Sequence, residues 1–135
     1  MGEPGDRITM AIPAKLQNDI KQFQRLQQEL ALVDQQRLQL EMKLRETTHT
    51  LEELKNVPEE APVYRPVGNL LVKAKGKKEV EDLLSEEKET LEVRFKALER
   101  QVGHLKERYE AMQKDLSEQL RSAGIGVEEG SEGSP

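Results

Sequence analysis

The chain has 135 residues, enough for one domain, and few of the bulky side chains that build a thick core. It has no Trp, two Phe and two Tyr, and charged residues make up 35% of it, the same share as hydrophobic residues. So little bulky apolar surface cannot offset the entropy lost in ordering a globular fold. A long-helix protein or a disordered chain remains, and the periodic apolar residues described below favour long helices.

Charge and cysteine content exclude several kinds of function. Residues 13–56 carry seven acids and seven bases, and residues 77–121 carry twelve acids and ten bases, so no nucleic-acid partner is expected. The absence of cysteine excludes disulfides, thiolate catalysis and cysteine-ligated metals. No segment reaches the ~20 apolar residues of a membrane span, and residues 1–9 contain no apolar signal core. We therefore expect a cytoplasmic protein with no membrane partner.

Residues 1–9 are expected to be a disordered extension, followed by a domain over residues 10–121 that opens with a helix over 13–56. Pro13 suits the first helical turn, and Asn56 and Pro58 mark the end. Steps of alternately four and three residues from Ile12 meet an apolar residue at ten of thirteen positions, which is the heptad pattern of a coiled coil. These positions are Ile12, Leu16, Asp19, Phe23, Leu26, Leu30, Val33, Arg37, Leu40, Leu44, Thr47, Leu51 and Leu54.

Residues 62–75 are predicted to form a β-hairpin, because Gly68-Asn69 is a two-residue turn signal between apolar runs. An isolated hairpin is marginal in water, and this one carries apolar residues on both faces and open edges. We expect its strands to join strands of other chains in an obligate oligomer rather than simply to lie over the helix ends. The expected register pairs Val67 with Leu70, Arg65 with Val72, and Val63 with Ala74.

A second helix is predicted over residues 77–121, and residues 122–135, with three acids and no base, are expected to be a disordered acidic tail. The nearly equal helices and the compact connector favour an antiparallel hairpin over a continuous rod. Nine of eleven heptad positions in the second helix are apolar. They are Leu84, Lys88, Leu91, Phe95, Leu98, Val102, Leu105, Tyr109, Met112, Leu116 and Gln119.

The sequence contains no motif that indicates catalysis. His49 and His104 are isolated, so they are expected to be surface residues and not metal ligands. Residues 76–78, Gly-Lys-Lys, do not match a phosphate-binding loop. A two-helix layer is expected to form no cleft. We therefore expect no enzyme activity, no cofactor and no metal.

Apolar residues remain at the helix ends that adjoin the termini. Ile20 and Leu120 stand one step off the heptad positions, so they are expected to be partly exposed. Such a tip could bind apolar segments of another protein, with the flexible Met112 adapting to different sequences. Equally, these residues could merely close the coiled coil.

The order of these parts resembles a β-class subunit of prefoldin over about residues 10–120. Three segments carry the resemblance: LQNDIKQFQRLQQEL, LEELKNVPEEAPVYRPVGNLLVKA and EKETLEVRFKALERQ. The central segment is the most specific, because generic coiled coils do not interrupt themselves in this way. Subunits of the α class have a longer connector with two hairpins, and here there is room for one.

The resemblance implies a mainly α fold, a long antiparallel coiled-coil hairpin with a short β-hairpin between its helices. It implies an ATP-independent holding chaperone, whose coiled-coil tips bind unfolded polypeptides and pass them to a group II chaperonin. The partners it implies are α-class subunits and further copies of the chain, two α with four β in a hexamer. The alternative is a structural coiled-coil oligomerisation or scaffold protein without client binding.

The resemblance also implies two sets of site residues. The oligomerisation platform would comprise Val63, Tyr64, Val67, Gly68, Leu70, Leu71 and Val72. The client-binding tip would comprise Ile12, Leu16, Ile20, Met112, Leu116 and Leu120.

Overall fold

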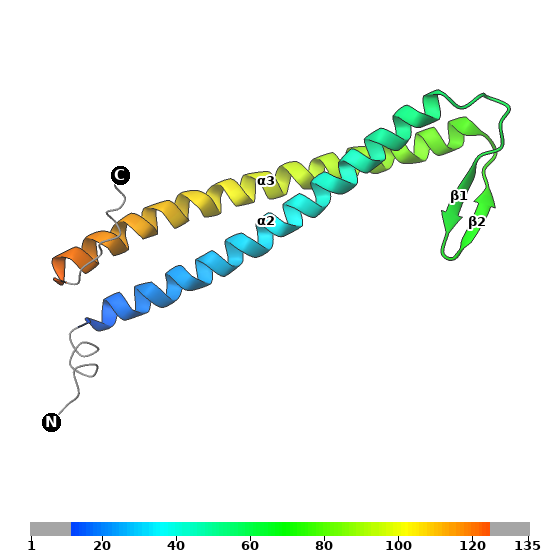
Figure 1. The fold of residues 1–135 in the computed structure, drawn as a ribbon. Helices are drawn as coiled ribbons and strands as arrows, with labels where there is room; N and C mark the ends of the chain where they lie inside the picture. The colour runs from blue at the N-terminus through cyan, green and yellow to red at the C-terminus, as the bar shows by residue number, and fades with distance from the viewer. Residues whose placement is uncertain (1–11, 125–135) are drawn as a thin grey trace. The chain divides into compact units, whose positions relative to one another are not determined.

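The computed structural model describes residues 12–124, and Figure 1 shows their four elements. In chain order these are α2 (Ala14–Lys55), β1 (Tyr64–Val67), β2 (Leu70–Lys73) and α3 (Lys77–Ser122). The expected mainly α fold, with two long helices joined by a two-stranded antiparallel hairpin, is confirmed. The disorder expected of residues 1–9, and of the tail beyond residue 124, lies outside the described residues.

The chain divides into two compact units, and both helices contribute to each. The terminal unit comprises, among the described residues, 12–33 and 101–124, which include the first part of α2 and the last part of α3. The hairpin unit comprises residues 34–100, which include the rest of both helices and both strands. In each unit the two helical stretches run antiparallel. In the terminal unit Asp19 bonds to Gln119 and Gln27 to Tyr109, and in the hairpin unit Lys43 pairs with Glu87 and Lys55 bonds to Lys77.

The heptad positions are the covered positions of both helices. All thirteen positions predicted for the first helix and all eleven predicted for the second are buried or half-buried. We call this row of side chains the seam. Burying each Leu or Val side chain stabilises the fold by about 1.5–3 kcal/mol, so the seam accounts for the helix pairing. Its most buried apolar members are Leu16, Leu26, Val33, Leu54, Leu91, Val102, Leu105 and Leu116.

Two polar residues that interrupt the seam of α2, Arg37 and Thr47, have partners within the same helix. The half-buried Arg37 places Nε 2.8 Å from Oδ1 of Asp34 and Nη1 3.5 Å from Oε1 of Glu41. The buried Thr47 donates its hydroxyl hydrogen to the carbonyl of Lys43, one turn earlier, at 2.9 Å. These partners lie on α2 itself, so the interruptions leave neither polar group unsatisfied inside the seam.

The two strands pair in the expected register. Val67 lies opposite Leu70 and Arg65 opposite Val72. Gly68 has a φ of 61°, whereas φ is not positive at Asn69, and these signs are those of a type II′ hairpin turn. The turn twists in the sense that the two flanking strands require.

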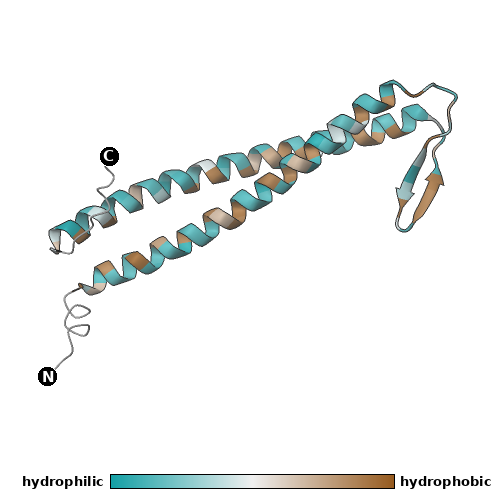
Figure 2. Cartoon of the chain, in the orientation of Figure 1, coloured by the Kyte–Doolittle hydropathy of each residue, from teal (hydrophilic) through white to brown (hydrophobic). Residues whose placement is uncertain are grey.

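All eight strand residues are exposed in the single chain. Figure 2 shows β2 as a hydrophobic strand, and the side chains of Leu70 and Leu71 are 68% and 74% exposed. Only at the base of the hairpin is an apolar residue buried: Ala74 is 6% exposed, and its N–H donates to the carbonyl of Val63 at 2.8 Å. Within residues 12–124, nothing covers the apolar faces of β1 and β2.

Candidate functional site

An uncharged groove of about 390 Å³ lies between the two helical stretches of the terminal unit. Side chains with helical spacing form each wall, so that Ile20, Gln24 and Gln27 stand at i, i+4 and i+7 on α2. None of the eight lining residues carries a charge. They are Ile20, Phe23, Gln24, Gln27, Gln113, Leu116, Ser117 and Leu120, and we call this site the tip groove.

The tip groove combines a buried residue with partly exposed apolar walls. Leu116 is buried in the seam, whereas Ile20 and Leu120 are half-buried, as their place one step off the heptad predicted. Phe23 stacks on Tyr109, with ring centroids 4.9 Å apart and 26° between the ring planes. Gln27 donates from Nε2 to the Tyr109 hydroxyl at 3.5 Å. These contacts hold the aromatic part of the site in place across the two helices.

The structure separates the six predicted tip residues. Ile20, Leu116 and Leu120 line the tip groove together. Leu16 is 1% exposed and adjoins a separate hollow with Pro13 and Gln119. Ile12 and Met112 are half-buried and do not line the tip groove. Leu16 therefore joins the helices, and the exposed apolar surface comes from residues beside the seam.

A polar contact links the helices near the tip groove. The Asp19 carboxylate accepts hydrogen bonds from Lys15 Nζ at 2.8 Å and from Gln119 Nε2 on α3 at 3.1 Å. The bond from Lys15, followed by that from Gln119, holds the pKa of Asp19 below its usual 3.8. The same bond with Asp19 raises the pKa of Lys15 above 10.5. The polar interruption of the seam at Asp19 is therefore a cross-helix contact.

Five groove residues are absent from the predicted tip set: the seam residue Phe23 and the polar residues Gln24, Gln27, Gln113 and Ser117. The four polar residues would be expected on the solvated faces of the helices. The signal that could have found them is spacing, because Gln24 and Gln27 follow Ile20 by one and two helical turns.

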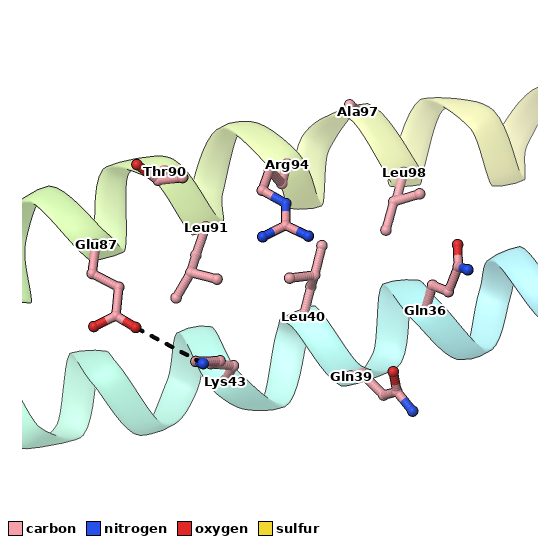
Figure 3. Close-up of a pocket in the computed structure, with 10 residues that line it drawn as sticks. All are labelled: Gln36, Gln39, Leu40, Lys43, Glu87, Thr90, Leu91, Arg94, Ala97 and Leu98. Atoms are coloured by element: carbon pink, nitrogen blue, oxygen red, sulfur yellow. Dashed lines mark ion pairs between the residues drawn. The ribbon is translucent and has the colours of Figure 1, made fainter. Parts of the chain in front are cut away.

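A second groove, of about 750 Å³, lies within the hairpin unit, so the expectation that a two-helix layer forms no cleft is wrong. Figure 3 shows it between α2 and α3, with the pair Lys43–Glu87 across one end at 4.0 Å. Arg94 points into it, beside Leu40 and Leu91. Charged side chains line this groove, so it suits apolar segments less well than the tip groove does.

The predicted platform residues lie together on the hairpin, six of them exposed and Val63 half-buried. Next to the hairpin, the start of α3 contacts the end of α2 in a way that the sequence analysis did not predict. Lys77 Nζ donates to the carbonyls of Lys55, at 3.3 Å, and Val57, at 2.9 Å. A cation at the C-terminal end of α2 is favourable because unpaired carbonyls gather there.

The two histidines predicted to be surface residues lie within residues 12–124. His49 and His104 are both exposed, and His49 lies 3.8 Å from Glu53. No group of three or more candidate metal ligands occurs in this part of the chain. Neither of its helices is apolar enough over a sufficient length to cross a membrane.

Comparison with known proteins gives a consistent family. The profile of the prefoldin subunit family matches residues 17–123. Prefoldin subunit beta of Archaeoglobus fulgidus is 48% identical over 109 residues, which cover 81% of this chain and 93% of that protein. The corresponding protein of Thermococcus kodakarensis is 41% identical over 112 residues, covering 83% and 92%. The crystal structure of the prefoldin beta subunit from Thermococcus strain KS-1 aligns with a TM-score of 0.75 at 38% identity, covering 82% of this chain and 96% of that one. The chain therefore belongs to the prefoldin subunit family of chaperones, in its β class.

Proposed function

We propose that the chain is a subunit of an ATP-independent holding chaperone and that it binds apolar segments of unfolded polypeptides in the tip groove. The observation that carries the proposal is the uncharged groove with half-buried Ile20 and Leu120 in its walls. Apolar side chains of an unfolded polypeptide leave water when they cover these residues. The amides of Gln24, Gln27 and Gln113 can both donate to and accept from a client backbone. Neither interaction demands a particular client sequence.

The proposal includes assembly through the hairpin. The exposed Leu70, Leu71 and Tyr64 form an apolar surface that gains stability when strands of other subunits cover it. The partners are other prefoldin subunits: α-class chains and further copies of this chain. The arrangement of two α with four β subunits, the transfer of clients to a group II chaperonin and the cytoplasmic location rest on family membership, and stay predictions.

The test is suppression of aggregation without ATP. The chain is assembled with an α-class partner, and light scattering follows a chemically unfolded client. The double variant Ile20→Ser with Leu120→Ser changes two half-buried groove residues and spares the buried Leu16 and Leu116. Two lost apolar contacts are expected to weaken client binding roughly tenfold or more. The variant should therefore need a correspondingly higher concentration to suppress scattering.

The matched control is Leu38→Ser with Val93→Ser, two exposed apolar residues of the hairpin unit. It should suppress aggregation as the original chain does, while sedimentation shows that both variants assemble. Equal suppression by the two variants would exclude the tip groove as the binding site. If the correctly assembled original complex suppresses nothing, the chain is a structural coiled-coil protein instead.

A further inference from the structure

The end of α3 has a specific stop geometry. Gly124 has a φ of 79°, in the left-handed region, and its N–H donates to the carbonyl of Arg121 at 3.0 Å. A left-handed glycine with this bond, made three residues back, matches one of the two hydrogen bonds of the Schellman arrangement of a helix C-terminus; the other is donated by the residue after the glycine, which lies outside the described residues. In that arrangement, the residue after the glycine turns back toward the helix and frequently makes an apolar contact four positions before the glycine.

Those two positions are occupied here by apolar residues. The residue after the glycine is Ile125, and four positions before the glycine stands Leu120. Leu120 is half-buried and lines the tip groove with Ile20 and Phe23. A contact between Ile125 and Leu120 would therefore start the tail at the rim of the groove. Val127 is two residues further on, within about 7 Å along an extended chain.

We propose that the chain's own C-terminal segment occupies the tip groove, with Ile125 and Val127 as the apolar residues that enter it. The groove is uncharged and partly apolar, and these two are the apolar residues of the segment 125–135. An unfolded client then has to displace the tail. This consequence rests on the proposed function, whereas docking of the tail does not.

Charge favours the same occupant. The segment 125–135 carries three acids, Glu128, Glu129 and Glu132, and no base. Residues 12–28 contain the α2 wall of the groove. They carry three bases, Lys15, Lys21 and Arg25, and one acid, Asp19, so their net charge is +2. The acids that follow Val127 would lie near a positively charged stretch of helix. This attraction is screened by salt, so it adds to the apolar contact without replacing it.

A disulfide-trapping experiment tests the docking. The chain contains no cysteine, so introduced thiols react only with each other. Glu128→Cys is combined with Gln24→Cys on the groove wall or, as the matched control, with Gln22→Cys. Gln22 is exposed like Gln24 but lies two residues away, on another face of α2. The complex with the α-class partner is oxidised mildly, and peptide mass spectrometry measures each disulfide.

We expect the Gln24→Cys pair to close about tenfold faster or more, because docking raises the local concentration of the tail thiol at the groove. Adding Ile125→Ser should remove this preference, and Ile125→Leu should retain it. Equal rates for the two pairs would overturn the proposal, whatever the complex does with clients. Disulfides between isotopically distinct chains in a mixed assembly would also overturn it, since a second copy would then occupy the groove.

Discussion

Leu26 and Leu32 are the same residue type on one helix, yet their surroundings differ. Leu26 is 3% exposed in the seam, whereas Leu32 is 57% exposed. We expect Leu26→Ala to lower the free energy of unfolding by about 2–4 kcal/mol, because it removes buried methyl groups and leaves a cavity. Leu32→Ala should change it by less than about 0.5 kcal/mol. Urea denaturation of the assembled complex compares the two, and equal losses would show that the seam does not run through Leu26.

The contribution of Asp19 to the stability of the fold depends on pH. Its pKa in the folded chain lies below the usual 3.8, so its stabilising contribution is present above pH 3.8 and is lost as pH falls through the folded value. The contribution of Lys15, whose pKa is raised, is present below pH 10.5 and is lost as pH rises through its folded value. Between these limits both groups are charged and their contact is intact.

Removing either donor should raise the pKa of Asp19 toward 3.8. The change should be larger for Lys15→Ala than for Gln119→Ala, because the bond from Lys15 is the larger cause of the lowered pKa. NMR titration of the Asp19 carboxyl carbon measures this. Gln101→Ala, an exposed glutamine on α3, is the control and should leave the titration in place. An unchanged pKa in Gln119→Ala would mean that the cross-helix bond does not form in solution.

At the scale of elements, Lys77 joins the start of α3 to the end of α2. Lys77→Met keeps most of the side chain's length but removes both donations to the carbonyls of Lys55 and Val57. A charged donor at a helix end stabilises the fold more than an exposed ion pair does. We therefore expect the free energy of unfolding to fall by about 1 kcal/mol. Amide hydrogen exchange should also become faster at residues 55–57.

The neighbouring Lys78 supplies the control for that substitution. Lys78 is exposed, and it pairs only with Asp82 among the described residues, at 3.5 Å within α3. Lys78→Met should therefore lower the free energy of unfolding by at most a few tenths of a kcal/mol. If the two variants exchange and unfold alike, the two carbonyl contacts contribute nothing to the connection between the end of α2 and the start of α3.

At the scale of the whole molecule, the exposed hairpin predicts an obligate assembly. Leu71→Ser removes the most exposed large apolar side chain of the strands. If other subunits cover Leu71, association should weaken roughly ten- to hundredfold, since burying a Leu contributes about 1.5–3 kcal/mol. Sedimentation velocity across a concentration series measures the change, and circular dichroism should show that the helices persist.

Leu32→Ser is the control for assembly, because Leu32 is similarly exposed but lies on α2 in the terminal unit. It should sediment as the original chain does. Should Leu71→Ser also assemble normally, the strands would not be the interface, and the apolar surface of the hairpin would need another partner.

The sequence alone determined the elements and their pairing. The heptad positions of both helices are all covered, and Gly68-Asn69 places the turn with the expected register. These features are local or periodic: a residue's place in a 3.5-residue repeat decides whether it faces the partner helix, and a two-residue turn decides which strand residues meet.

The tertiary structure decided which residues form a surface. The family resemblance assigned Leu16 and Leu116 to the client-binding tip, but both are buried in the seam, while Ile20 and Leu120 remain half-buried beside them. The heptad periodicity could not assign Gln24 or Gln113 to a site, because a polar residue joins a binding site only when a groove forms next to it. The reason is physical: spacing along one helix gives the direction of a side chain, whereas its exposure depends on which side chains of the other helix lie against it.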